Sequence, residues 1–223
     1  GRLFPGVSKE VEELFGTKPG TEVDMRNILE DKDIDIISIA TPDHWHSRIT
    51  IDAAKAGKHV YCEKGLTRTF DEAVDVYDTV KETGITFQLG HQNRQVEANE
   101  KAKQIIKQGL LGPINLVEIA TNRNSPWGAW VWGIHPKGNE QTIDWETFQE
   151  PSPNKIPFGE EALKRFFRWR CWYDYGTGLS GDLFSHDFDA INQIMDIGIP
   201  KYASSTGGVY FYKDGRDVPD VWN

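Results

Sequence analysis

The stretch Asp35-Ile36-Ile37-Ser38-Ile39-Ala40, followed by Thr41-Pro42, decides the fold of this chain. Its apolar run is short and unbroken, and proline follows it, which favours a strand buried in a parallel sheet over an antiparallel strand with one wet face. Apolar residues recur at helical spacing on both sides of this run. The helices predicted there cover residues 7–15, 25–30 and 44–56.

Two more short strands are predicted along the chain, at 59–62 and 85–89. A helix predicted at 71–83 lies between them and ends at Gly84, the residue type that most easily adopts a left-handed conformation after a helix. Strands that alternate with helices over tight connections predict a doubly wound parallel α/β sheet. Right-handed crossovers then bring the carboxyl ends of all three strands to one edge of that sheet.

The pattern changes after Arg94, where we expect a domain boundary that divides the chain into 1–94 and 95–223. The stretch 122–167 is rich in Trp, Gly, Pro and Asn, which predicts long ordered loops over a cleft. The other elements predicted in the second part are helices at 97–108 and 182–195, an alternating strand at 114–120 and a strand around 208–212.

Composition limits the classes of partner. The chain has 223 residues and a formal net charge of -9, so a nucleic-acid partner is not expected and a small-molecule ligand is the better hypothesis. No apolar run approaches the roughly 18 residues that cross a bilayer, and no membrane partner is expected. The two cysteines, Cys62 and Cys171, are predicted to be free thiols. His44, His46 and His91 lack a matching carboxylate cluster, so no metal site is predicted.

Three loops follow the three predicted strands, at 41–44, 63–65 and 91–94. Ligands of open parallel sheets bind beyond the carboxyl ends of the strands, so these loops should line one crevice. Lys64 would place its ammonium beside the ligand there. The alternative is a solvated loop lysine that pairs with Glu63.

A second candidate site lies in the predicted helix at 182–195. Asp182 and His186 are four residues apart, which puts them on one face near the start of a helix. A carboxylate one turn away can fix the tautomer of an imidazole and prepare it to act as a general base. The alternative is a capping aspartate and a histidine that faces the core.

Three segments together resemble the Gfo/Idh/MocA family of oxidoreductases. They are 40–46 (ATPDHWH), 56–64 (AGKHVYCEK) and 178–189 (GLSGDLFSHDFD), in the order found in that family. The resemblance implies a Rossmann-type domain that holds NAD or NADP, here 1–94 and incomplete. It further implies an α+β domain with a large, mainly antiparallel sheet, here 95–223, which supplies the substrate face and the contact of a homodimer or homotetramer.

The resemblance also implies roles for individual residues. The lysine of the family's Glu-Lys-Pro motif falls on Lys64, and its aspartate and histidine fall on Asp182 and His186, which we take as the catalytic residues. The predicted cofactor contacts are Thr41, Pro42, His46, Glu63, Lys64, Gln92 and Arg94. The predicted substrate contacts are Arg123, Trp130, Arg168, Trp169 and His186.

The chain departs from the family pattern at two places. Gly65 replaces the proline after the lysine, which removes a ring that fixes φ. No Gly-x-Gly-x-x-Gly precedes Thr41, so the phosphate-binding turn is not found, and we expect a fragment that lacks this turn and the C-terminal end of the family's second domain. Any export signal would lie upstream as well, so we expect a cytoplasmic location, with the periplasm as the alternative.

The expected reaction is hydride transfer between a nicotinamide cofactor and a ring carbinol carbon of a sugar, glycoside or cyclitol. His186 would act as general base, with Lys64 stabilising charge on the same oxygen. One alternative is a redox-neutral, nicotinamide-dependent glycosidase or lyase, and another is a non-catalytic subunit that binds cofactor or sugar. Exposed tryptophans at 127, 130 and 132 suit stacking on a sugar and equally suit a subunit interface.

Overall fold

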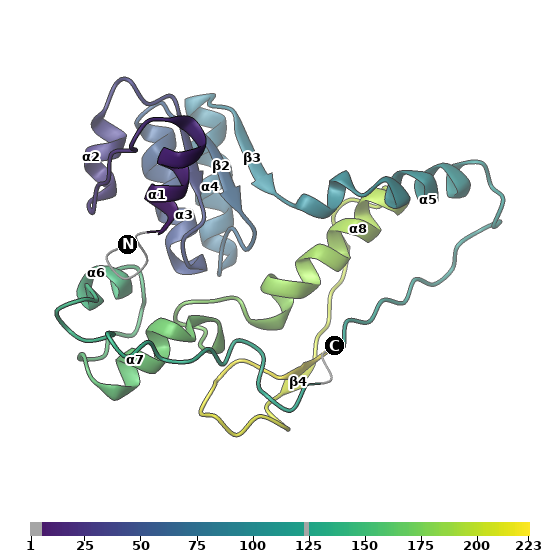
Figure 1. Cartoon of the computed structure of the whole chain (residues 1–223). Coiled ribbons are helices and arrows are strands. Elements are labelled where there is room, and N and C mark those ends of the chain that lie inside the picture. The colour runs from purple at the N-terminus through teal and green to yellow at the C-terminus, as the bar shows by residue number, and fades with distance from the viewer. Residues whose placement is uncertain (1–5, 123–124) are drawn as a thin grey trace.

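The computed structural model describes residues 6–122 and 125–223. Three parallel strands form its first sheet in the order β1-β2-β3, with Ile39 beside Cys62 and Cys62 beside Leu89. Their bounds are β1 (Ile36–Ile39), β2 (His59–Glu63) and β3 (Phe87–Gly90). The helices α3 (Asp43–Lys55) and α4 (Phe70–Thr83) connect the strands, so the predicted Rossmann-type alternation is confirmed (Figure 1).

Local sequence signals set the ends of these helices. The Asp24 carboxylate accepts a hydrogen bond from the backbone of α2 (Met25–Glu30), and Thr69 caps α4 in the same way. Gly84 ends α4 with a φ of 67°, a conformation that glycine takes without a Cβ clash. The chain's first described helix is α1 (Gly6–Phe15).

One face of the sheet carries the first hydrophobic core. Val60 and Cys62 alternate inward and are fully buried, together with Ile49 and Ala53 of α3. The prediction of a strand buried on both faces is wrong for β1, because Ile36 is 65% exposed. β1 is also an edge strand, because it pairs with a strand on one side only within the described residues.

The remainder of the chain consists of helices joined by long loops. The loops predicted at 122–167 occupy most of that stretch, and two short helices interrupt them. The helix expected at 182–195 begins two residues early, as a π-helical turn that runs into an α-helix. The elements are η1 (Gln92–Gln95), α5 (Glu97–Lys107), α6 (Trp145–Gln149), α7 (Glu160–Phe167), η2 (Trp169–Cys171), η3 (Ser180–Phe184), α8 (Ser185–Met195) and an antiparallel pair β4 (Gly207–Gly208) and β5 (Val221–Trp222).

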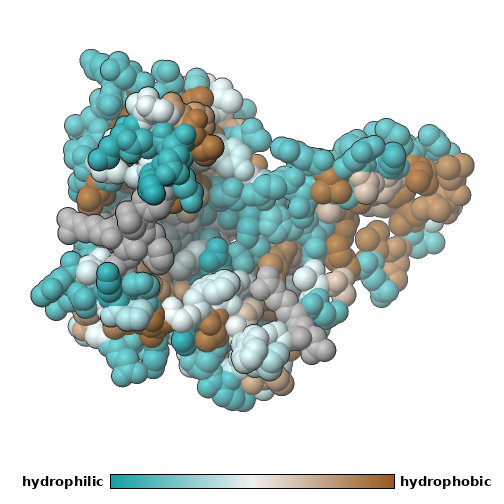
Figure 2. Space-filling model, in the orientation of Figure 1, coloured by the Kyte–Doolittle hydropathy of each residue, from teal (hydrophilic) through white to brown (hydrophobic). Residues whose placement is uncertain are grey.

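The segment predicted as a strand at 114–120 forms no strand. It runs extended after α5, on an arm that reaches away from the sheet (Figure 1), and none of the described residues pairs with its backbone. Its apolar side chains gather on this arm (Figure 2), with Leu116 74% exposed. A strand needs a partner for its backbone hydrogen bonds, which explains why alternation alone misled the prediction.

A second core lies below the sheet in Figure 1, around α6 and α7. Its buried members include Trp145, Trp172 and Tyr175. Cys171 belongs to it, whereas Cys62 belongs to the first core, and both are free thiols as predicted. In the described ranges, no helix is long and apolar enough to cross a membrane.

Candidate active site

Lys64 lies directly after β2 and forms an ion pair with Asp182. Its Nζ is 2.7 Å from the Asp182 carboxylate and 2.6 Å from the Asp182 carbonyl oxygen. The two side chains are 15% and 9% exposed. The alternative pairing of Lys64 with Glu63 is wrong, because the Glu63 carboxylate instead accepts hydrogen bonds from Gln92 at 2.9 and 2.7 Å. The ion pair therefore joins residues 118 positions apart in sequence.

Asp182 lies within the π-helical turn Ser180–Phe184. Burial alone would raise the pKa of its carboxyl group, but the hydrogen bond and charge of Lys64, with Arg170 behind them, hold that pKa below its usual value. The Arg170 Nε lies 3.2 Å from the same carboxylate oxygen. Asp182 is thus an anion that holds two cations together.

Gly181 makes the tight turn around Asp182 feasible. A Cβ at this position would clash with the side chain of Thr177, so a larger residue does not fit without a shift. Such π turns occur frequently at functional sites. The glycine and the turn together bring Asp182 to Lys64.

His186 does not contact Asp182 as predicted. A π turn closes hydrogen bonds over five residues rather than four, so the spacing of four no longer stacks the two side chains. No hydrogen bond between them exists among the described residues, and the predicted contact is wrong. The His186 ring instead lies edge to face with that of His91, with the centroids 6.0 Å apart.

His46 is predicted to contact a cofactor, and this stays a prediction. Its side chain is buried, with the residue only 1% exposed. Its Nδ1 lies 2.9 Å from the carbonyl oxygen of Gly65, and its Nε2 lies 2.7 Å from that of Thr41. Both ring nitrogens therefore lie against backbone carbonyl oxygens.

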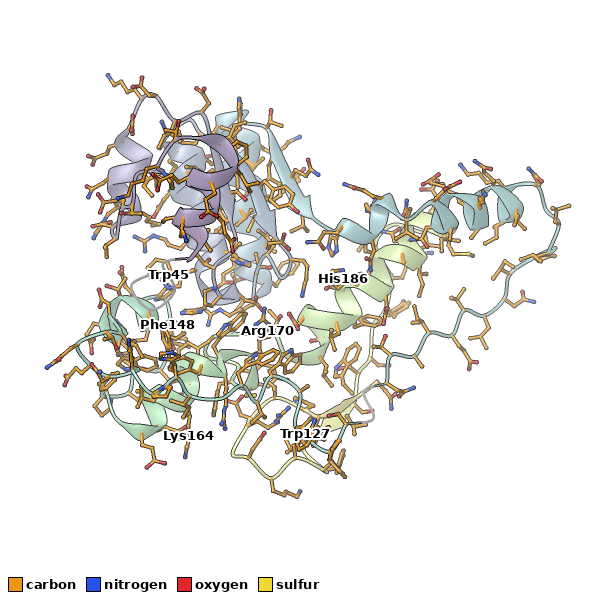
Figure 3. All side chains as sticks on the ribbon, in the orientation of Figure 1. Trp45, Trp127, Phe148, Lys164, Arg170 and His186 are labelled. Carbon is orange, nitrogen blue, oxygen red and sulfur yellow. The ribbon has the colours of Figure 1, made fainter. Side chains whose placement is uncertain are left out.

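Thr41 and Pro42 line a pocket of about 460 Å³ at the carboxyl end of β1. Trp45 and Phe148 form another part of its wall and lie next to each other in Figure 3, where Trp45 Nε1 donates to the Phe148 carbonyl at 3.0 Å. Most of its wall comes from α2, α3 and α6, and Lys64, Asp182 and His186 do not line it. Sequence reasoning found Thr41 and Pro42 but not the residues contributed by α6.

Arg94 extends from η1 toward α8. Its Nε lies 2.8 and 3.0 Å from the two carboxylate oxygens of Asp189. This side chain is 52% exposed, so its predicted contact with a cofactor stays a prediction.

The predicted substrate residues lie in different environments. Trp130 is buried in the second core, at 6% exposure, so its predicted contact with a sugar stays a prediction that its burial does not support. The Arg168 Nε donates to the Trp132 carbonyl at 2.8 Å. Trp169 lies under the guanidinium of Arg170, whose Cζ is 4.0 Å from the ring centroid. Arg123 lies outside the described residues.

Arg170, which lies near the ion pair, is not indicated by the sequence. Arg170 lies in the middle of the molecule with His186 (Figure 3), and its partner Asp182 is 12 residues away in an irregular stretch, so no periodicity indicates it. His91 stood in a strand-end loop that the sequence did single out. Burial, aided by the charges of His186, Arg94 and Lys64, lowers its pKa, against the effect of Asp189.

Comparisons with known proteins agree with the fold. A family model, GFO_IDH_MocA, described as an oxidoreductase family with an NAD-binding Rossmann fold, matches residues 5–91. Levoglucosan dehydrogenase of Pseudarthrobacter phenanthrenivorans is 41% identical over 210 residues, which cover 92% of this chain and 46% of that protein. A 2,7-anhydro-N-acetylneuraminate hydratase of Escherichia coli is 30% identical over 125 residues, covering 56% of this chain and 30% of that protein.

A solved structure of levoglucosan dehydrogenase, in complex with NADH and levoglucosan, superposes on 98% of this chain and 50% of its own with a TM-score of 0.62 and 26% identity. This chain therefore spans about half the length, or less, of the relatives it matches. The matched range 5–91 contains the whole parallel sheet and the loop of Lys64. The chain belongs to the Gfo/Idh/MocA family of oxidoreductases.

Proposed function

We propose that this chain is part of an NAD(P)-dependent oxidoreductase that moves hydride between a nicotinamide cofactor and a ring hydroxyl carbon of a sugar or cyclitol. The observation that carries the proposal is the buried ion pair between Lys64 and Asp182 at the carboxyl edge of the parallel sheet. A lysine held at this edge has an ammonium group where ligands of such sheets bind.

The residues at this edge fit a nicotinamide cofactor. The pocket beside Thr41 and Pro42 offers about 460 Å³ at the end of β1. Two buried imidazole nitrogens, the Nδ1 atoms of His91 and His186, lack a hydrogen-bond partner within the described ranges and would gain one from a bound polar group. A bound nicotinamide supplies the carbon that accepts or donates hydride.

Each side chain then has a distinct task. His186 removes the proton from the substrate hydroxyl as hydride leaves the carbon. Lys64 donates a hydrogen bond to the same oxygen and stabilises the negative charge that develops there. Asp182 acts on Lys64 rather than on His186, because its carboxylate fixes the ammonium in place.

The relatives indicate where to look for the substrate. Levoglucosan, the sugar named in the solved complex, is the first compound to test, and NAD is the first cofactor. The aromatic side chain of Trp169 and the guanidinium of Arg170 provide a flat face and hydrogen-bond donors of the kind that sugar sites use.

The test measures two quantities on the same protein, binding of NADH by fluorescence and reduction of NAD in the presence of levoglucosan. Lys64→Met and His186→Ala should each lower turnover by about 100-fold or more and leave NADH binding intact. Lys55→Met, an exposed lysine at the end of α3, is the matched control and should retain turnover. Unchanged turnover in both site variants would refute the assignment, and NADH binding without turnover over a sugar panel would indicate a non-catalytic subunit.

A second candidate reaction is a redox-neutral elimination or hydrolysis that uses the nicotinamide transiently. The match to a hydratase acting on an anhydro sugar favours it. A redox-neutral enzyme would form product without accumulating NADH. A dehydrogenase would produce one NADH for each molecule of product. Absorbance of NADH together with product analysis separates the two.

We also propose that the protein forms a homodimer or homotetramer. The exposed apolar side chains of the arm after α5, among them Leu110 and Leu116, support this proposal, because such a surface is usually covered in solution. Light scattering should give a mass two or four times 25.4 kDa. Leu116→Glu should reduce it, and a monomeric mass for the unaltered chain would refute the proposal.

A further inference from the structure

The first turn of α3 contacts both of the segments that supply the Lys64–Asp182 pair. Asp43 accepts a hydrogen bond of 2.8 Å from the hydroxyl of Thr177, three residues before the π turn. His46 contacts the carbonyl oxygen of Gly65, the residue after Lys64, at 2.9 Å. Asp43 and His46 are 3% and 1% exposed.

The two contacts of His46 restrain its ring completely. Its two nitrogens lie within hydrogen-bond distance of two carbonyl oxygens, those of Thr41 and Gly65. The ring therefore ties the loop after β1 to the loop after β2.

Asp43 has an equally closed environment. Burial raises the pKa of its carboxyl group, and the Thr177 hydroxyl and His46 oppose that rise. A buried carboxyl group is costly unless it is hydrogen-bonded, so the Thr177 contact should persist in solution.

Gly65 lies between these two contacts. A Cβ at this position would be 3.1 Å from the Thr177 hydroxyl oxygen and 3.4 Å from the Asp43 carboxylate. The family's proline at this position would add a whole ring to this space. Glycine permits the two loops to meet at Asp43, and the contact through His46 restrains the backbone that proline would otherwise stiffen.

We propose that Asp43 and His46 are positioning residues that hold the Lys64 loop and the π turn of Asp182 at the separation needed for their ion pair. An effect of these two residues on catalysis rests on the proposed function. Their effect on the position of Lys64 does not. The prediction concerns the Lys64 ammonium itself, whose chemical reactivity is measurable without any turnover.

The experiment labels the lysines of this chain with an acylating reagent and follows Lys64 by mass spectrometry. In the unaltered protein, the ion pair and the low exposure of Lys64 should make it among the slowest lysines to react. His46→Ala and Thr177→Val should each accelerate acylation of Lys64 by about tenfold, while exposed lysines such as Lys55 keep their rates.

His44→Ala is the matched control for His46→Ala. It removes an equally buried imidazole from the same turn of α3, but that ring contacts the Phe148 carbonyl and neither of the two loops. Thr177→Ser keeps the hydroxyl that Thr177→Val removes. Acylation of Lys64 in this variant should therefore be as slow as in the unaltered protein. General loosening of the fold would accelerate labelling in all variants alike.

The outcomes separate the inference from the proposed function. Equal acceleration in His44→Ala and His46→Ala, or no acceleration in His46→Ala and Thr177→Val, would overturn the positioning role. Selective acceleration with rescue by Thr177→Ser would support it, even if the protein reduces no NAD with any sugar. Turnover by the unaltered protein without selective acceleration would leave the proposed function standing and the positioning role refuted.

Discussion

The imidazole rings of His91 and His186 stand at 88° to each other, with their centroids 6.0 Å apart. They come from the loop after β3 and from α8, so this contact joins the parallel sheet to the helix of the candidate base. The Nδ1 atom of each ring is buried without a hydrogen-bond partner in the described parts of the chain. Burial is the main cause that lowers the pKa of His91.

The charges around His91 predict how its pKa responds to substitution. Burial first, then the positive charges of Arg94 and Lys64, lower this pKa, whereas Asp189 raises it. In an NMR titration the imidazole of His91 should titrate below the usual value of about 6.5. Asp189→Asn should lower this pKa further, and Lys64→Met should raise it.

The two variants move the pKa of His91 in opposite directions, which serves as an internal control. A general change in burial would shift it in the same direction in both. If both variants raise it, or if His91 titrates above 6.5 in the unaltered protein, the electrostatic account of this contact is wrong.

Asp182→Asn should destabilise the protein strongly. It removes the anion that lies between Lys64 and Arg170 and leaves two cations facing each other in a site that is mostly buried. Breaking a buried ion pair costs about 3 to 5 kcal/mol, and we expect about 3 kcal/mol because the Lys64 and Arg170 side chains are partly exposed. The free energy of unfolding, measured by urea denaturation, tests this value.

The control for this substitution is Asp187→Asn, five residues along. Asp187 accepts a hydrogen bond from Thr121 and makes no ion pair within the described residues, so its loss should cost clearly less. Adding Lys64→Met to Asp182→Asn should recover part of the lost stability, since one of the two unpaired cations is gone. Equal losses in Asp182→Asn and Asp187→Asn would contradict the role of the ion pair.

The parallel sheet and the loop of Lys64 could be predicted from sequence because their signals are local. The apolar run at 36–39, the proline after it and Gly84 each act through the residue's own backbone preference. The burial of β1 was predicted wrongly, because burial depends on which element covers Ile36, and no local signal specifies that.

The candidate site was predicted less well for a related reason. Asp182 and His186 were found by their spacing, but the spacing presumed an α-helix, and Gly181 permits a π turn that directs Asp182 to Lys64. Trp130 was assigned to a sugar site by its residue type, yet it lies in the second core with a φ of 66°. In both cases, contacts between segments that are distant in sequence determine where the side chain lies, and no local sequence pattern indicates such contacts.

The pair of Arg94 and Asp189 should contribute to the attachment of α8 to the end of the sheet. Arg94 binds both carboxylate oxygens at once, a geometry that lysine cannot reproduce. Arg94→Lys should therefore cost about 1 kcal/mol, a value limited by the exposure of the arginine side chain, and should accelerate amide hydrogen exchange in α8.

Arg48→Lys is the matched substitution for this test. Arg48 pairs with Asp52 within a single helix, on the surface, so its replacement should cost less than about 0.5 kcal/mol and leave exchange in α8 unchanged. Hydrogen exchange by mass spectrometry resolves the helices separately. Unaltered exchange in α8 for Arg94→Lys would show that the pair of Arg94 and Asp189 does not hold α8 in place.

His44 should make the protein less stable in mild acid. Burial lowers its pKa from 6.5 to about 4, so the unfolded chain binds a proton at a higher pH than the folded one. The stability contributed by the neutral ring is complete above pH 6.5 and is lost as the pH falls toward 4. This loss amounts to about 3 kcal/mol, since each unit of pKa difference corresponds to about 1.4 kcal/mol.

His44→Phe removes the titrating group and should flatten the dependence of unfolding free energy on pH between 6.5 and 4. Trp45→Phe is the matched control, because Trp45 donates to the same Phe148 carbonyl but does not titrate. It should lower stability by a similar amount at every pH and keep the slope of the unaltered protein. Urea denaturation at several pH values measures both slopes, and an unchanged slope in His44→Phe would assign the acid sensitivity to another group, with His91 the next to test.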